Sequence, residues 1–261
     1  MAGSPDSVPW HDAWHAALYG SQGFYRRPEG PAGHFTTSAV GIPHATPILA
    51  QALINLADRH HLSTIVDFAA GGGALIAAIA AHDSSKHCVA VDITERPTSL
   101  PANIGWWRAD GGAMLPSEWE GLHDCLVVAH EWLDVVPCPV AQRDQDGSWR
   151  LVLVNSAGAE SLGGLVTGAN LDWLTEWVSS AVERAEVGSA RDQAWDGLCA
   201  GISNGLAVSI DYGHEYAERP VGGTLIGFHC GRAVTPARWQ HRHHRACGCR
   251  LPRCGRSIAA T

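Results

Sequence analysis

Residues 64–75 read TIVDFAAGGGAL, in which a β-branched and apolar run is followed by an acid and three consecutive glycines. Stiff β-branched residues favour a strand, and the apolar pattern of ALIAAIAAH (74–82) favours a helix. Glycines between the two allow a sharp turn and a close approach of backbone to ligand. The stretch predicts a strand, a turn and a helix, and the turn either binds a ligand or only reverses the chain.

Further strand-like runs lie at 87–93, 103–110, 124–131 and 205–213. Apolar runs without strict alternation are typical of parallel strands whose two faces are both covered. Strands alternating with helices indicate an α/β fold with a Rossmann-like, doubly wound, mostly parallel sheet.

Other segments surround this sheet. Helices are expected around Trp10 to Leu18 and from Pro47 to about His60, with a glycine- and proline-rich loop at 20–38 between them. PVAQR and WRLVLV flank RDQDGS, which predicts a β-hairpin closed by an Asp-Gly turn. Residues 169–200 have the pattern of two amphipathic helices, so we expect a helical and hairpin insertion beside the sheet.

The predicted elements divide the chain into four parts. They are the N-terminal helices and a loop (1–62), the core of the sheet (63–136 and 204–236), the insertion (137–203) and a basic tail (237–261). We expect the tail to be disordered.

The composition is that of a folded globular protein, with 46% hydrophobic and 17% charged residues. No apolar run approaches the roughly 20 residues of a membrane span, and the N-terminus lacks a signal-peptide pattern. We therefore expect a cytoplasmic protein that contacts no membrane. The net charge of −8 disfavours nucleic-acid binding through a basic surface. The irregularly spaced cysteines are interpreted as small buried residues: Cys88, Cys125, Cys138, Cys199 and Cys230.

The glycine run distinguishes two cofactor classes. A dinucleotide fingerprint that starts at Gly71 needs a third glycine where the chain has Ile76. The pattern acid-x-Gly-x-Gly-x-Gly, which is used for S-adenosylmethionine, fits Asp67, Ala69, Gly71 and Gly73, with alanine at the first glycine position.

Charge also favours S-adenosylmethionine, because its sulfonium and ammonium groups suit a carboxylate at Asp67 better than a pyrophosphate does. Asp92 ends the next strand, where it can accept hydrogen bonds from ribose hydroxyls, and Asp110 ends the third, where it can receive the adenine amino group. Ligands of doubly wound sheets bind at the carboxyl ends of the strands. We expect the three acids to surround one site, although each alone could be a turn or capping residue.

The segment AHEWLDVVPCPV (129–140) follows the fourth strand of the predicted sheet. Glu131 and Asp134 are three apart, so a helical turn would place both carboxylates on one face. They are candidate catalytic residues that could orient a cationic nucleophile such as a guanidinium group. The alternative is that they cap a helix and offset its dipole.

The sequence resembles the MidA-like class I methyltransferases (the DUF185 family), whose mitochondrial members assist the assembly of respiratory complex I. The resemblance rests on five segments, GFYRRPEGPAGHFTTS, VDFAAGGGAL, VVAHEWLDVVPCPV, AEVGSARDQAW and IDYGHEYAERPVGGTLIGF. It implies a donor site for S-adenosylmethionine at Asp67–Gly73, Asp92 and Asp110, without a metal. It also implies that the HFTTS segment, with Thr37 and Ser38, closes over the donor. Glu131 and Asp134 would face the acceptor, which in mitochondrial relatives is a protein arginine.

The chain departs from the family pattern at two positions, with Ala69 in place of glycine and His130 in place of asparagine. These departures leave open an assembly or scaffold protein that binds the donor but has lost turnover. A separate alternative is an NAD(P)-binding oxidoreductase, which Asp67 and Ile76 disfavour. The sequence does not define the oligomeric state.

The family pattern stops near Pro236, and the remaining tail holds six arginines and no acids. Its histidines and cysteines match no strong zinc-binding spacing. Codons chosen from Arg238 onward and shifted by one base can spell DGSTDITAHVAVD, which looks like the family's continuation. Our hypothesis is that the frame shifts after about Pro236, so that the last two strands of the class I sheet are missing. Sequencing the DNA around that codon tests this hypothesis, and an uninterrupted reading frame there would contradict it.

Overall fold

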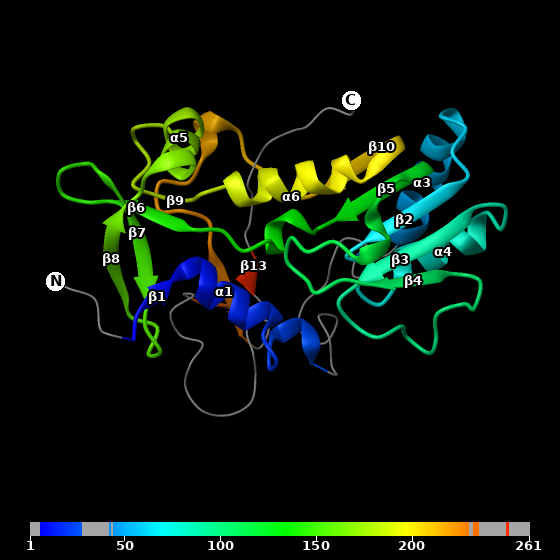
Figure 1. The fold of residues 1–261 in the computed structure, drawn as a ribbon, viewed down its shortest axis with the longest axis horizontal. Helices are drawn as coiled ribbons and strands as arrows, with labels where there is room; N and C mark the ends of the chain where they lie inside the picture. The colour runs from blue at the N-terminus through cyan, green and yellow to red at the C-terminus, as the bar shows by residue number, and fades with distance from the viewer. Residues whose placement is uncertain (1–5, 28–41, 43, 230–231, 235–248, 251–261) are drawn as a thin grey trace. The chain divides into compact units, whose positions relative to one another are not determined.

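A computed structural model describes residues 6–27, 42, 44–229, 232–234 and 249–250 (Figure 1). The chain divides into two compact units, which are described separately below. One unit contains the described residues of 25–133 and 194–211, and the other those of 1–24, 134–193 and 212–257. The boundaries predicted from the sequence, which place 1–62 in one segment, stay a prediction.

The first unit is built on a five-stranded sheet of order β10-β5-β2-β3-β4 (Figure 1). Every neighbouring pair in it is parallel. Its strands are β2 (Thr64–Phe68), β3 (His87–Asp92), β4 (Gly105–Arg108), β5 (Leu122–His130) and β10 (Ile202–Ile210). The parallel sheet predicted from the sequence is confirmed. Because all five strands run the same way, their carboxyl ends lie at one edge.

Both faces of this sheet are covered, as the apolar runs predict. Ile65 packs in a core cluster with residues of α3 (Ala45–Arg59) and α4 (Ala74–His82). Phe68 lies three residues later, so its side chain points to the opposite face. There it makes edge-to-face contacts with Trp119, in η3 (Ser117–Trp119), and with Trp132. The indole N–H of Trp119 donates to the carbonyl of Leu198 in α6 (Ser189–Ala200) at 3.0 Å.

β10 is the end strand of this sheet and pairs only with β5 among the described residues. Much of β10 is partly exposed, whereas the second half of β5 is buried. The described part of the chain thus contains the first five strands of a class I sheet. The positions where two further strands are expected lie beyond residue 236, mostly outside the described residues.

The second unit holds an antiparallel sheet of order β1-β7-β6-β9, in which β8 also pairs with β7. Its strands are β1 (Val8–Pro9), β6 (Val140–Arg143), β7 (Trp149–Val154), β8 (Glu160–Leu165) and β9 (Arg184–Glu186). The predicted hairpin is confirmed as β6 and β7, whose turn is closed by the Asp144 N–H bond to the Ser148 carbonyl at 2.9 Å. The sequence analysis missed β8 and β9, because β8 contains two glycines and β9 has only three residues.

Helices and short elements complete the second unit. They are α1 (Trp10–Tyr19), η1 (Phe24–Arg26, which continues into the first unit), η4 (Leu133–Val135), α5 (Gly168–Trp177), η5 (Tyr216–Glu218) and a three-stranded sheet of β11 (Ile226–His229), β12 (Arg232–Val234) and β13 (Cys249–Arg250). The two helices expected in 169–200 are confirmed as α5 and α6.

Three of the cysteines are buried free thiols, as predicted: Cys88, Cys125 and Cys138. Cys199 is partly exposed, and Cys230 lies outside the described residues. No helix in the described ranges is both long and apolar enough to cross a bilayer. Within those ranges, no group of three or more histidine, cysteine or acidic side chains is placed to hold a metal ion.

A buried carboxylate explains two segments that carry the family resemblance. Glu186, at the end of β9 in AEVGSA, is 1% exposed. It accepts hydrogen bonds from the Thr224 N–H at 2.9 Å, the Thr224 hydroxyl at 2.8 Å and the Leu225 N–H at 2.9 Å. Glu186 therefore fixes the GGTL segment within the second unit.

We expect Glu186→Ala to destabilise the protein by about 3 kcal/mol, because it leaves buried donors without a partner. Thermal unfolding followed by circular dichroism measures the change. Glu176→Ala, at an exposed position of α5, is the control and should stay within about 0.5 kcal/mol of wild type. Equal melting of the two variants would contradict this role for Glu186.

Candidate active site

The turn after β2 is built from residues with left-handed backbone conformations. Ala69 has φ 61°, Gly71 φ 58° and Gly73 φ 76°. A Cβ at Gly73 would come within 2.8 Å of a Leu100 methyl carbon, whereas a Cβ at Gly71 or Gly72 would meet nothing within 4 Å. Glycine is therefore required at Gly73 because a side chain there would meet Leu100, whereas there is open space beside Gly71 and Gly72. Ala69 adopts the same left-handed conformation, which is energetically unfavourable for any residue other than glycine.

Asp67 is 2% exposed and lies one residue before the end of β2. Its Oδ2 atom is buried and has no hydrogen-bond partner within the described structure. Burial raises the pKa of this carboxyl to about 7, and the charge of Asp92 adds to the rise, while the Ile76 N–H opposes it. A buried, unpartnered carboxylate oxygen beside a glycine turn suits a ligand that carries positive charge.

Asp92 ends β3 and holds the turn in place. Its Oδ2 accepts a hydrogen bond from the Gly71 N–H at 2.8 Å, and its Oδ1 accepts from the N–H and the hydroxyl of Thr94 at 3.0 and 2.8 Å. Burial raises the pKa of Asp92, whereas the bonds from Thr94, Gly71 and Ile93 oppose the rise. Asp92 is thus a structural anchor of the glycine turn as well as a candidate ribose ligand.

Asp110 lies two residues beyond β4 and is exposed. The Ala109 N–H donates to the Asp92 carbonyl at 3.0 Å, and the Arg26 guanidinium donates to the Asp110 carbonyl at 3.4 Å. Gly111 and Gly112 follow with φ 93° and φ 61°. The structure therefore brings Asp67 and Asp92 together and places Asp110 in the next loop along the same edge.

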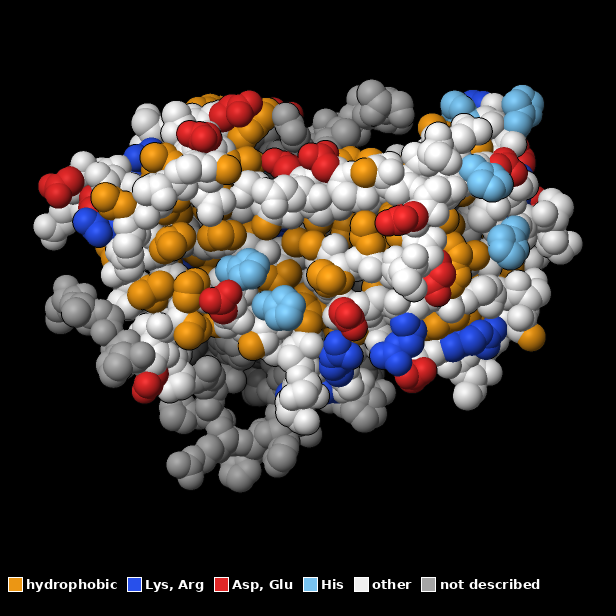
Figure 2. All heavy atoms as spheres, viewed as in Figure 1, with side chains coloured by type: hydrophobic (Ala, Val, Ile, Leu, Met, Phe, Trp, Pro, Cys, Tyr) orange, Lys and Arg blue, Asp and Glu red, His pale blue; other side chains and the backbone are white. Residues whose placement is uncertain are grey.

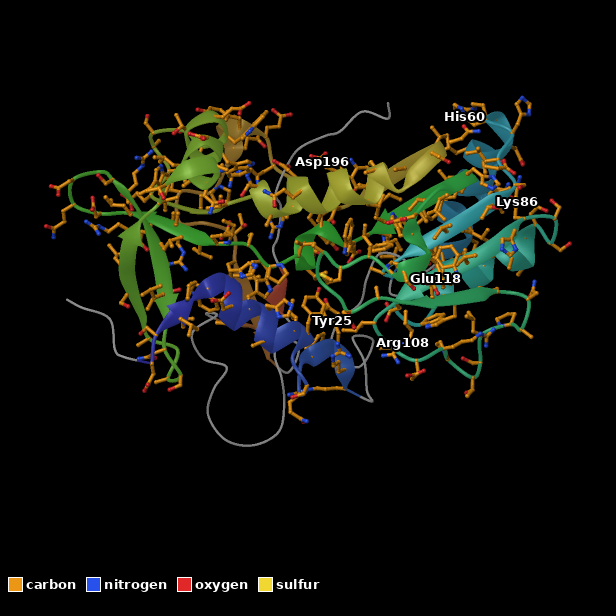
Figure 3. All side chains as sticks on the ribbon, viewed as in Figure 1. Tyr25, His60, Lys86, Arg108, Glu118 and Asp196 are labelled. Carbon is orange, nitrogen blue, oxygen red and sulfur yellow. The ribbon has the colours of Figure 1, made fainter. Side chains whose placement is uncertain are left out.

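Arg108, at the end of β4, extends the same edge (Figure 3). It donates to the Ile93 carbonyl at 3.2 Å and forms an ion pair with Glu95. On the face drawn in Figure 2, basic side chains lie close to acidic ones in this region.

Glu131 directly follows β5 and has a strained backbone, with φ 52°. It is 8% exposed, its N–H donates to the Ile210 carbonyl at 2.8 Å, and its Oε1 lies 3.8 Å from His130 Nε2. The predicted helical turn is a 3₁₀ turn that begins only at Leu133. Asp134, 4% exposed, lies in that turn and belongs to the other unit. The predicted pairing of the two carboxylates stays a prediction.

Two predicted site residues, Thr37 and Ser38, lie outside the described residues. The sequence analysis missed two residues that shape this edge. Thr94 binds Asp92, and Trp132 donates from its indole to the Gly112 carbonyl at 2.9 Å. Of these two, only Thr94 left a signal, because an acid two residues before a threonine is typical of a local side-chain turn. Asp211, which directly follows β10, also lies here, and its Oδ2 accepts from the Leu133 N–H at 2.8 Å.

Residues 78–247, more than half of the chain, match the model of a family described as "Putative S-adenosyl-L-methionine-dependent methyltransferase". The match runs past Pro236, and the frame-shift hypothesis stays a prediction. A comparison with curated proteins gives no match.

Two solved structures from Burkholderia thailandensis have the same fold. One is a COG1565 superfamily member bound to S-adenosyl-homocysteine, with a TM-score of 0.71 and 20% identity over 95% of this chain and 70% of that one. The other is a COG1565 superfamily protein in a native crystal structure, with a TM-score of 0.65 and 22% identity over 95% of this chain and 68% of that one.

The parallel sheet and its strand order are those of a class I methyltransferase. The chain belongs to the family of S-adenosylmethionine-dependent methyltransferases that the matched model describes, in agreement with the resemblance to MidA-like proteins. Its cofactor is S-adenosylmethionine, so the alternative of an NAD(P)-binding oxidoreductase is wrong. The buried Asp67 oxygen and the open space beside Gly71 and Gly72 fit a cationic donor.

We expect Ala69→Gly to stabilise the protein by roughly 0.5–1 kcal/mol, since glycine adopts a left-handed φ without steric cost. Ala70→Gly is the matched control, because Ala70 has no positive φ and its replacement should destabilise by about the same amount. Thermal unfolding of both variants tests the opposite signs. A loss of stability in Ala69→Gly would show that the turn is not strained.

We expect donor binding to strengthen as the pH rises from about 6 to about 8. Asp67 has a pKa of about 7 without ligand, so it is largely neutral below that pH, and a cationic ligand favours its ionised form. Calorimetry in two buffers of different ionisation enthalpy measures the proton released on binding. Asp67→Asn is the control that retains the titration of the donor's own amino group. The same pH dependence in both proteins would contradict the role of Asp67.

Proposed function

We propose that this methyltransferase acts on the guanidinium group of a protein arginine. The proposal rests on the two acids of the AHEWLDVVPCPV segment. Both lie just after β5, and Glu131 and Asp134 are 8% and 4% exposed. A guanidinium group offers planar, paired N–H donors that match the geometry of a carboxylate.

The backbone of Glu131 is the observation that carries the proposal. A residue other than glycine with φ 52° is strained, and such strain persists only where the surrounding structure enforces it. Here the Glu131 N–H bond to the Ile210 carbonyl enforces it, at the carboxyl end of β5. Strained residues are concentrated at functional sites, and this one carries a buried carboxylate.

The proposal divides the candidate residues into a group for the donor and a group for the acceptor. S-adenosylmethionine supplies a methyl group that is already activated on a positively charged sulfur. Asp67, Asp92 and Asp110 would hold the donor, and Thr37 and Ser38 would cover it. Glu131 and Asp134 would orient the guanidinium group so that one nitrogen lone pair faces the methyl carbon. As the new N–C bond forms and the S–C bond breaks, a carboxylate of this pair would accept the proton that leaves the nitrogen.

A second function is a donor-binding assembly protein that has lost turnover. It is favoured by Ala69, whose left-handed conformation strains the donor turn, and by His130, whose Nε2 lies 3.8 Å from Glu131 Oε1. A protonated imidazole there would occupy the carboxylate that the first function assigns to the acceptor.

We expect Glu131→Gln to lower methyl transfer by at least about 100-fold, because the amide neither accepts the proton nor attracts a cation. Donor affinity should change less than about twofold, since Glu131 is assigned to the acceptor. The assay incubates the purified chain with lysate proteins and labelled donor, and hydrolysis of the products tests for methylarginine. Glu120→Gln, at an exposed position of the same unit, is the control.

The outcomes separate the two functions. Donor binding without any transfer by the wild-type chain would favour the assembly protein. Labelled methyl groups on a residue other than arginine would contradict the arginine proposal while leaving the methyltransferase intact.

A further inference from the structure

We infer that Trp132 is a positioning residue for the donor. It lies in the HEWLD segment but is itself assigned to neither donor nor acceptor. The structure shows it to be 2% exposed, with a hydrogen bond to the loop after β4 and a ring contact to the last residue of β2. The inference rests on the proposed placement of the donor along Asp67, Asp92 and Asp110.

The first contact of Trp132 is with the loop after β4. Its indole N–H donates to the Gly112 carbonyl at 2.9 Å, and both groups are buried. Gly111 and Gly112 have φ 93° and φ 61°, a conformation that the loop would lose easily without an external restraint. Because Asp110 precedes these two glycines, the bond from Trp132 restrains the backbone that carries the proposed adenine ligand.

The second contact is with Phe68 at the end of β2. The two rings meet edge to face, with centroids 4.7 Å apart and planes at 69°. Phe68 lies between Asp67 and Ala69, so the ring of Trp132 also supports the start of the glycine turn. Trp132 thus follows β5 and contacts the end of β2 and the loop after β4, which carry two of the three proposed donor ligands.

The third connection runs through the backbone on either side of Trp132. The Glu131 N–H donates to the Ile210 carbonyl at 2.8 Å, and the Leu133 N–H donates to Asp211 Oδ2 at 2.8 Å. Both partners lie at the end of β10. These bonds anchor the segment on which Trp132 stands, so its indole N–H is presented to Gly112 from a fixed base.

Trp119 supplies a matched control. It makes an edge-to-face contact with the same Phe68, at 4.9 Å and 71°, and its indole N–H also donates to a buried carbonyl, that of Leu198 at 3.0 Å. The difference lies in the partner: Leu198 belongs to α6, whereas Gly112 belongs to a loop at the strand ends. Replacing either tryptophan by phenylalanine removes one buried N–H donor and keeps an aromatic ring.

The test compares Trp132→Phe with Trp119→Phe by calorimetric titration with S-adenosylhomocysteine and by thermal unfolding. We expect similar losses of thermal stability in both variants. The dissociation constant should rise about five- to twentyfold in Trp132→Phe and less than about twofold in Trp119→Phe. Trp132→His, which keeps a ring N–H, should recover part of the affinity.

Equal affinities in the two phenylalanine variants would overturn the inference, because Trp132 would then have only a structural role. Failure of the wild-type chain to bind S-adenosylhomocysteine would instead contradict the donor site itself.

If the variants fail to fold, the inference can still be tested on the wild-type chain. Hydrogen exchange should slow together in residues 109–114 and 130–133 when S-adenosylhomocysteine binds, because the Trp132–Gly112 bond joins them. Protection confined to one of the two segments would also overturn the inference.

Discussion

The hydrogen bond from the Gly71 N–H to the Asp92 carboxylate is the interaction on which the donor side of the site depends. It joins the glycine turn after β2 to the end of the neighbouring strand. It also places a second carboxylate close enough to Asp67 to add to the rise in pKa that burial causes. The bond is possible because β2 and β3 are parallel neighbours, so that the end of one lies beside the end of the other. The fold therefore brings two acids together before any ligand binds, as the proposed placement of a positively charged donor requires.

The sequence was sufficient to predict this part of the protein, for physical reasons that can be named. A buried parallel strand must be apolar throughout, so TIVDF and HCVAVD are recognisable, and an acid within or at the end of such a run stands out. The family pattern has glycine where Ala69 stands, and the left-handed φ observed there explains that preference. The same reasoning did not reveal that Asp92 anchors the turn, because that bond joins two segments far apart in the chain.

Other features could not be predicted because they depend on contacts between distant residues. β8 and β9 have no strand pattern of their own and exist because β7 and β6 pair with them. The buried Glu186 looks like any acid in the sequence until its donors, Thr224 and Leu225, are seen beside it. In HEWLD the acids indicated chemistry and Trp132 did not, because its bond to Gly112 forms only when two loops approach each other. A single contact between residues far apart in the chain produces no repeating pattern in the sequence, so it cannot be predicted from periodicity.

The strand order also has a consequence for the synthesis of the protein. β5 lies between β2 and β10 in the sheet, yet β6, β7, β8 and β9 of the second unit separate β5 from β10 in the chain. On the ribosome, which adds about 5–20 residues per second, β5 therefore leaves the exit tunnel several seconds before its second neighbour exists. During that interval one side of β5, whose central residues CLVVA are apolar, has unpaired backbone groups. Until β10 is made, this edge of β5 is open to pairing with other extended chains.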